Sequence, residues 1–286
     1  MQKRYTKSPK KAPVEPVNEL NELWPGQSLD LLKSLHILTR DGKLNQDSRR
    51  KLKQVQHLVQ LIKPHLDGLN NVADLGAGKS YLGFMLYDLW LRERPDTRLW
   101  AIEQRQELID ACKLLASRSK FDRISFIPKS ILEASDAPEL PEQIEAVTAL
   151  HACDTATDEA IAFALKKKAK FIALVPCCQA EVARLLDAAP AGAAKDEDAV
   201  LWRHGIHRRE FGSHLTNVIR ALFLESQGYK VRVTELIGWE HSMKNELILA
   251  ERVQLGNGQA RRQLESLMGK YPLAMKLFDL VPAPAQ

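Results

Sequence analysis

The feature that most constrains the fold of this 286-residue chain is a regular alternation of short apolar strands and amphipathic helices between residues 71 and 175. Short apolar runs bounded by turn residues are typical of buried strands, and apolar residues at three- and four-residue spacing are typical of helices. The pattern predicts strands at 71–75, 98–103, 124–127, 144–150 and 171–175, and helices at 80–91, 106–117 and 157–167. This order predicts a parallel sheet with helices on both faces.

The rest of the chain extends this sheet. A helix is expected at 52–66 and another at 210–227, followed by strands at 229–237 and 244–250. A connection of about six residues between the last two strands is typical of an antiparallel hairpin. We therefore expect an α/β fold with a doubly wound, mainly parallel seven-stranded sheet, an antiparallel terminal hairpin and an N-terminal helical extension.

Four segments are expected along the chain. Residues 1–18 form a basic, proline-containing tail that we expect to be disordered, 19–46 a helical extension, 47–254 the main domain and 255–286 a C-terminal helical tail. The net charge of +5 resides in residues 1–11, which hold five basic residues and no acid, so that 36 basic and 36 acidic residues remain elsewhere. Such a tail is either an arm attracted to phosphates or a solvated end.

Composition favours a soluble, cytoplasmic protein. No apolar run approaches the roughly 20 residues that a membrane-spanning helix needs, and the basic N-terminus lacks the apolar stretch of a signal peptide. The chain has only four cysteines, a number and spacing that suggest no disulfide framework. The oligomeric state is left open.

A glycine-rich turn follows the first strand, in the segment Val72-Ala-Asp-Leu-Gly-Ala-Gly-Lys-Ser80. Glycines let a ligand approach the backbone beside the amides of a helix N-terminus. The phosphate-binding loop of nucleotide hydrolases would need its first glycine at Ala73, inside the strand, and a dinucleotide fingerprint would need a glycine where Tyr81 stands. The remaining pattern is acid-x-Gly-x-Gly, which suits a cofactor with a cationic aminoacyl end.

This turn resembles the first motif of class I methyltransferases, which use S-adenosylmethionine. The resemblance implies that the turn holds the methionine part of the cofactor. It also implies that Glu103, at the end of the second strand, accepts hydrogen bonds from the ribose hydroxyls. An acid at this position would serve a nicotinamide dinucleotide in the same way. Ser80 replaces the family's usual third glycine. The expected cofactor-binding residues are Asp74, Gly76, Ala77, Gly78, Glu103, Gln104, Ser130 and His151.

Two segments rich in histidine and cysteine follow the fourth and fifth strands, Leu-His151-Ala-Cys-Asp154 and Pro176-Cys-Cys178. They resemble a methyltransferase subfamily whose substrates are uncharacterised, and this likeness covers roughly residues 45–252. Asp154 and His151 are the candidates for a general base. The cysteines suggest tight packing beside the cofactor, redox chemistry or zinc binding, although adjacent cysteines fit zinc spacing poorly; we expect no metal.

The basic segment 202–210 makes RNA the leading substrate class, since arginine matches phosphates and Trp202 could stack on a base. The alternative for this segment is a solvated helix start. The expected substrate-binding residues are Pro176, Cys177, Cys178, Arg208, Arg209, Lys244 and Asn245. The predicted activity is methyl transfer to rRNA or tRNA; the alternatives are a protein or small-molecule substrate, a non-catalytic RNA-interaction module that binds the cofactor, or a nicotinamide-dependent oxidoreductase.

Overall fold

A computed structural model describes residues 22–150, 152–176, 179–188, 197–236, 246–271 and 273–281. Seven strands form one sheet in the order β3-β2-β1-β4-β5-β7-β6. The strands are β1 (Asn71–Leu75), β2 (Arg98–Ile102), β3 (Ile124–Ile127), β4 (Ala146–Ala149), β5 (Phe171–Leu174), β6 (Tyr229–Glu235) and β7 (Glu246–Arg252). The first five are parallel, whereas β7 is antiparallel to both β5 and β6. The expected fold class is confirmed.

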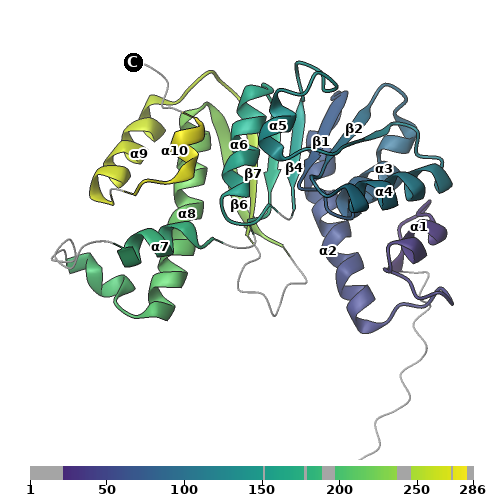
Figure 1. Cartoon of the computed structure of the whole chain (residues 1–286), viewed down its shortest axis with the longest axis horizontal. Helices are drawn as coiled ribbons and strands as arrows, with labels where there is room; N and C mark the ends of the chain where they lie inside the picture. The colour runs from purple at the N-terminus through teal and green to yellow at the C-terminus, as the bar shows by residue number, and fades with distance from the viewer. Residues whose placement is uncertain are drawn as a thin grey trace, which may run out of the picture.

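Ten α-helices are described around this sheet. They are α1 (Leu29–Ser34), α2 (Gln46–Ile62), α3 (Tyr81–Leu89), α4 (Gln106–Arg118), α5 (Ile131–Ser135), α6 (Ala156–Lys166), α7 (Glu181–Ala188), α8 (Gly205–Ser226), α9 (Gly258–Lys270) and α10 (Lys276–Leu280). Figure 1 shows α1 to α4 toward the β1 and β2 end of the sheet and α7 to α10 toward the β6 and β7 end. No helix in the described ranges is long and apolar enough to cross a membrane.

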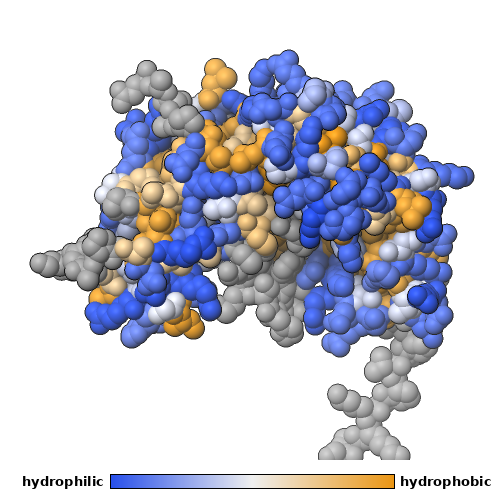
Figure 2. Space-filling view, viewed as in Figure 1, coloured by the Kyte–Doolittle hydropathy of each residue, from blue (hydrophilic) through white to orange (hydrophobic). Residues whose placement is uncertain are grey.

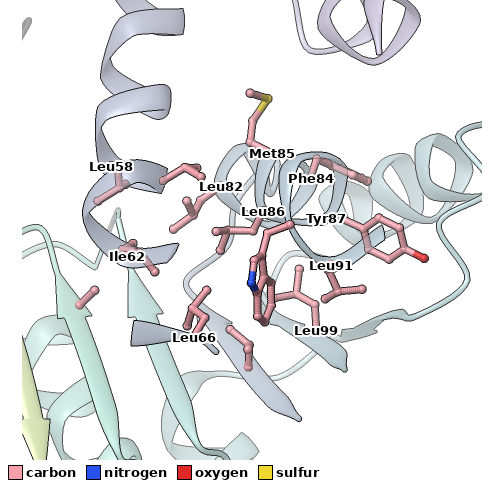
Figure 3. Close-up of a cluster of buried hydrophobic side chains, with 14 of the residues drawn as sticks. Leu58, Ile62, Leu66, Leu82, Phe84, Met85, Leu86, Tyr87, Leu91 and Leu99 are labelled. Atoms are coloured by element: carbon pink, nitrogen blue, oxygen red, sulfur yellow. The ribbon is translucent and has the colours of Figure 1, made fainter. Parts of the chain in front are cut away.

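The sheet is buried on both faces, which explains why its central strands are apolar without alternation. Every residue of β4 and β5 is buried. Each face has its own hydrophobic cluster, one centred on α2 and α3 and the other on α6 and α8. In Figure 3, Leu58 and Ile62 of α2 face Leu82 and Leu86 of α3, and Leu99 of β2 closes the cluster from the sheet side.

The N-terminal extension is part of this core. Leu31, Ile37 and Leu44 belong to the same buried cluster as α2 and α3. The amide of Ser28 donates a hydrogen bond of 2.8 Å to the carboxylate of Asp88 on α3, and Asp88 also pairs with Arg92. These contacts fix α1 and the segment that follows it against the main domain.

Helices α7 and α8 cross closely at Gly212. A Cβ atom at this position would lie 2.7 Å from the backbone nitrogen of Ala183, closer than real Cβ atoms come to their neighbours. The absence of a side chain therefore permits the close approach of the two helix backbones.

Gly212→Ala is expected to lower the free energy of unfolding by roughly 1–3 kcal/mol, because the added methyl group forces two packed backbones apart. The matched control is Gly269→Ala on α9, where a Cβ atom would meet nothing within 4 Å. That change should be neutral or stabilising by up to about 1 kcal/mol through helix propensity. Urea denaturation of both variants checks the pair, and equal effects would contradict the assignment.

Candidate functional site

The carboxyl ends of β1 and β4 lie side by side at the point where the strand order reverses, which is where open α/β sheets bind ligands. β2 lies on the other side of β1, with Leu75 opposite Ile102. The glycine-rich turn after β1 and the acid after β2 therefore meet at one edge of the sheet.

The turn approaches Glu103 through its backbone. Gly76 and Gly78 have φ angles of +61° and +57°, a region that favours glycine. The amide of Gly78 donates a 2.9 Å hydrogen bond to Oε2 of Glu103. A Cβ atom at Gly76 would meet nothing within 4 Å, so the space above the turn is open to a ligand.

A cavity of about 320 Å³ lies at this junction. Five of the residues expected to bind the cofactor line it: Gly76, Gly78, Glu103, Gln104 and Ser130. Ile102, Ile131, Ala152 and Ala156 add apolar walls. A buried carboxylate beside an apolar pocket and an open glycine turn provides the groups that the ribose, the base and the aminoacyl end of S-adenosylmethionine require.

Glu103 is already held by a neighbouring arginine. Oε1 accepts hydrogen bonds from the backbone amide and Nε of Arg105 at 3.0 and 2.8 Å, and Oε2 accepts one from Nη2 at 3.1 Å. Burial alone would raise the pKa of Glu103, but these hydrogen bonds and that of Gly78 hold the pKa below its ordinary value. Glu103 is thus ionised, as an acceptor for two hydroxyl groups must be.

Asp74 does not line this cavity. It is 2% exposed, and its carboxylate accepts a hydrogen bond of 3.1 Å from the hydroxyl of Thr148 on β4. Burial raises the pKa of Asp74 to about 7, although the hydrogen bonds from Thr148 and from the backbone of Gly83 oppose the rise. Asp74 therefore joins β1, β4 and the start of α3 beneath the turn. Ala77 is likewise buried, and its amide bonds to the carbonyl of Ile102.

Ser130 and Asp154 both cap helices. The hydroxyl of Ser130 and the carboxylate of Glu133 form a capping box at the start of α5. Oδ1 of Asp154 accepts the amides of Ala180 and Glu181 at 2.9 and 3.0 Å, ahead of α7, and Oδ2 pairs with Arg184 at 2.8 Å. Burial would raise the pKa of Asp154, but these contacts lower it. They favour a structural role for Asp154 over that of a general base.

A buried ion pair fixes the loop after β4. Arg220 of α8 and Asp158 of α6 have fully buried side chains and make two hydrogen bonds of 2.8 Å. Arg220 also donates to the backbone carbonyl of Asp154 at 2.7 Å, and Asp154 has a left-handed φ of +51°. This arginine thereby holds the loop that lines the cofactor cavity at Ala152.

Glu159 connects the cavity to the end of the chain. Glu159 lines the cavity, and its carboxylate pairs with Lys276, the first residue of α10. The amide of Lys276 also donates to Glu181 of α7 at 2.8 Å.

In the basic segment 202–210, which includes the start of α8, Trp202, Arg208 and Arg209 have partners within the protein. Trp202 stacks on Phe211 with ring centroids 5.1 Å apart and meets the edge of Tyr271. Arg208 pairs with Asp187 at 2.8 Å, and Arg209 with its neighbour Glu210 at 3.1 Å. Phe211 and Tyr271 thus give the Trp202 ring partners within the protein, which weakens the expectation that it stacks on a base. In Figure 2, hydrophobic residues show between α8 and α10, whereas hydrophilic residues cover α3 and α4.

Two further cavities flank Tyr81, the first residue of α3. One, of about 370 Å³, lies between the end of α1 and α4 and includes His36, Lys79 and Arg118. The other, of about 290 Å³, lies between α2, Tyr81 and Leu150. Neither lining includes a carboxylate among the described residues. The sequence did not indicate these sites, since their walls come from segments far apart in the chain.

Several expected residues cannot be placed. His151, Cys177, Cys178, Lys244 and Asn245 lie outside the described residues. Pro176 is buried, and its carbonyl accepts a 2.9 Å hydrogen bond from Gln179. Within the described ranges, no group of three or more His, Cys, Asp and Glu side chains could hold a metal ion.

Glu103→Gln is expected to weaken the binding of S-adenosylmethionine roughly 10- to 100-fold, because charge-assisted hydrogen bonds to the ribose are lost. Arg105→Ala is expected to act oppositely and tighten binding up to about fivefold, because the ribose hydroxyls need no longer displace an exposed guanidinium. Calorimetric titration measures both, with the exposed Glu142→Gln as control. Weaker binding by Arg105→Ala would contradict this account of the ribose site.

Asp74 gives stability a distinctive pH dependence. A carboxyl with a raised folded-state pKa binds its proton more tightly when folded, so the free energy of unfolding should decrease as pH rises from about 4 to about 7 and then level off. Asp74→Asn removes this contribution. We expect the difference between wild type and Asp74→Asn in urea denaturation to change across that pH range; parallel curves would exclude a raised pKa.

Comparison with known proteins agrees with the geometry. A family model described as a methyltransferase domain matches residues 50–185. Comparison with curated proteins gave no match.

Three solved structures illustrate the similarity of fold, each compared with this chain by sequence identity, coverage and TM-score. A protein from Klebsiella pneumoniae proposed to be an O-methyltransferase has 14% identity and a TM-score of 0.51, covering 82% of this chain and 94% of its own. The methyltransferase PaMTH1 of Podospora anserina, solved with S-adenosylhomocysteine, has 13% identity and a TM-score of 0.50, covering 85% and 100%. TrmK of M. capricolum, bound to the same cofactor product, has 13% identity and a TM-score of 0.44, covering 73% of each chain. Residues 50–185 therefore match a methyltransferase domain, and the fold is that of solved methyltransferases that bind S-adenosylmethionine or its product.

Proposed function

We propose that this methyltransferase transfers the methyl group of S-adenosylmethionine to RNA. The observation that carries the proposal is the charge of the two cavities that flank Tyr81. Their linings contain Lys51, Lys79, Arg118 and His36, and no carboxylate among the described residues. A cavity of this charge favours an anionic substrate.

The cations of these cavities are available to a ligand. Lys51, Lys79 and Arg118 form no ion pair within the described ranges, and all three are exposed. By contrast, the arginines that first suggested RNA, Arg208 and Arg209, are each paired with a carboxylate. The support for RNA therefore comes from the cavities beside Tyr81 and not from the arginines at the start of α8.

The same charges argue against the main alternative. A lysine or arginine side chain of a protein substrate would bring a cation beside Lys79 and Arg118, where no described lining residue neutralises it. A small anionic molecule satisfies the charge but leaves most of two cavities, of about 370 and 290 Å³, without a ligand. A nucleic-acid strand can occupy both, with a phosphate in one and a base in the other.

The bound cofactor supplies a methyl group on a positively charged sulfur, whose transfer breaks the sulfur–methyl bond, forms a bond to the acceptor atom and releases the acceptor's proton to solvent. The residues of this chain bind and orient the reactants. In this proposal Glu103 holds the ribose, the Gly78 turn holds the methionine end, and Arg220 keeps the loop after β4 in place. Positioning of this kind supplies much of the rate of a group transfer.

The test is to incubate the protein with S-adenosylmethionine labelled in its methyl group and with separated RNA, protein and small-molecule fractions of a cell extract. The label is expected in RNA. The Glu103→Gln variant should lose this labelling, which ties the activity to the cofactor site. Label in the protein or small-molecule fraction would overturn the proposal, and RNA binding without label would indicate a non-catalytic module.

The Lys79→Ala/Arg118→Ala double variant should weaken binding to single-stranded RNA and reduce the slope of log affinity against log salt by about 1.4, corresponding to two lost phosphate contacts. The matched control is Lys166→Ala/Lys168→Ala, which removes two lysines that pair with Asp136 and Glu142 on the far side of the domain core. Fluorescence anisotropy at several salt concentrations measures both. Equal slopes for the two double variants would contradict a phosphate site at this cavity.

A further inference from the structure

We propose that the cavity between α2 and Tyr81 receives one unstacked base of the RNA and presents it to the methyl donor, while the adjoining basic cavity holds the phosphates of the same strand. This inference rests on the proposed function and specifies its substrate site. It also gives the N-terminal extension a role in the reaction.

The walls of this cavity have the character of a base-binding slot. They are formed by Ile37, Val55, Leu58, Tyr81, Leu150 and Leu236. Ile37, Leu58 and Leu236 are at most 2% exposed, so most of the wall is fixed by the core. At about 290 Å³ the cavity is near the lower end of the range for ligand pockets, roughly 300–1,000 Å³, which suits one planar ring system better than a peptide segment.

Tyr81 provides the surface on which a base can stack. It lines both cavities and is only partly buried. No other aromatic ring of the described residues packs against it, in contrast to Trp202. Stacking on an aromatic side chain is sequence-tolerant and contributes about 1–3 kcal/mol per base in single-strand binding.

Polar groups lie where the rest of a nucleotide would emerge. Lys51, on the first half of α2, is exposed at the apolar cavity, and Lys79 is exposed at the basic one. The apolar walls of the slot suit the base of a nucleotide, and the cations outside it suit the phosphate. Tyr81, as the shared wall, places the two halves next to each other.

The slot lies next to the cofactor cavity along two segments of the chain. Leu150 lines the slot, and Ala152, two residues later, lines the cofactor cavity. Gly78 lines the cofactor cavity, and Tyr81, three residues later, lines the slot. The turn after β1 and the end of β4 therefore each contribute residues to both the donor and the acceptor cavity, and in this inference methyl transfer takes place at that edge of the sheet.

The extension completes this slot. Ile37 comes from the segment between α1 and α2, which the Ser28–Asp88 hydrogen bond and the buried leucines of α1 hold against α3. Without that segment the slot would be open on one side. We infer that residues 22–45 are a substrate-recognition element built into the domain.

The deciding variant is Val55→Trp, which fills the slot from α2 without touching the cofactor cavity. Its kcat/KM for the RNA fraction labelled by wild type should fall at least tenfold, while the Kd for S-adenosylmethionine stays within twofold. Gln60→Trp, on the exposed face of the same helix, is the matched control and should behave as wild type.

A second series guards against misfolding of the tryptophan variant. Tyr81→Ala should lower kcat/KM more than Tyr81→Phe, because only the latter keeps a stacking surface. A single-stranded RNA oligonucleotide carrying 2-aminopurine should gain fluorescence on binding wild type, as its base unstacks, and gain less with Val55→Trp.

The outcomes separate this inference from the proposed function. If wild type labels protein or small molecules, the proposed function is wrong. If wild type labels RNA but Val55→Trp and Tyr81→Ala label it equally well, only the base-binding slot is wrong.

Discussion

The burial of one parallel sheet on both faces is the constraint from which the site follows. β4 and β5 are covered on both sides, and β1 pairs in parallel with both β2 and β4, so the carboxyl ends of β1, β2 and β4 reach the same edge of the sheet. The glycine turn after β1 and Glu103 after β2 therefore lie close together because their strands are neighbours. The cofactor cavity is a consequence of strand order, and side-chain contacts refine it.

Two acids near the carboxyl ends of neighbouring strands, Asp74 inside β1 and Glu103 just after β2, have opposite environments, which separates their roles. Glu103 accepts hydrogen bonds from Arg105 and Gly78 and remains ionised, whereas Asp74 is enclosed by β1, β4 and α3 and has a pKa near 7. A carboxylate that receives hydroxyl groups must face the ligand, but one that joins three elements can lie beneath it. Of the two acids, Glu103 lines the cavity and Asp74 lies in the structural core beneath it.

The sequence predicted what depends on local periodicity and strand order. The seven strands, the antiparallel hairpin and the convergence of Gly76, Gly78 and Glu103 follow from patterns within short windows. It did not predict the ion pair between Arg105 and Glu103, because this depends on side-chain conformation. It also did not predict the basic cavity at Arg118 or the slot at Tyr81, because side chains from distant segments form their walls. The packing of Trp202 could not be predicted for the same reason. One of its partners, Tyr271, lies about 70 positions later in the chain, and only tertiary packing brings the two rings together.

The pairing of Glu159 with Lys276 has a consequence for the whole chain. One carboxylate belongs at once to the wall of the cofactor cavity and to the attachment of α10, so the local electrostatic field at the cavity depends on whether the last helix is docked. By reciprocity, any ligand that senses this field alters the docking equilibrium of α10 by the same free energy. Through Glu159, the C-terminal segment thus contacts the wall of that cavity, although it lies outside the matched residues 50–185.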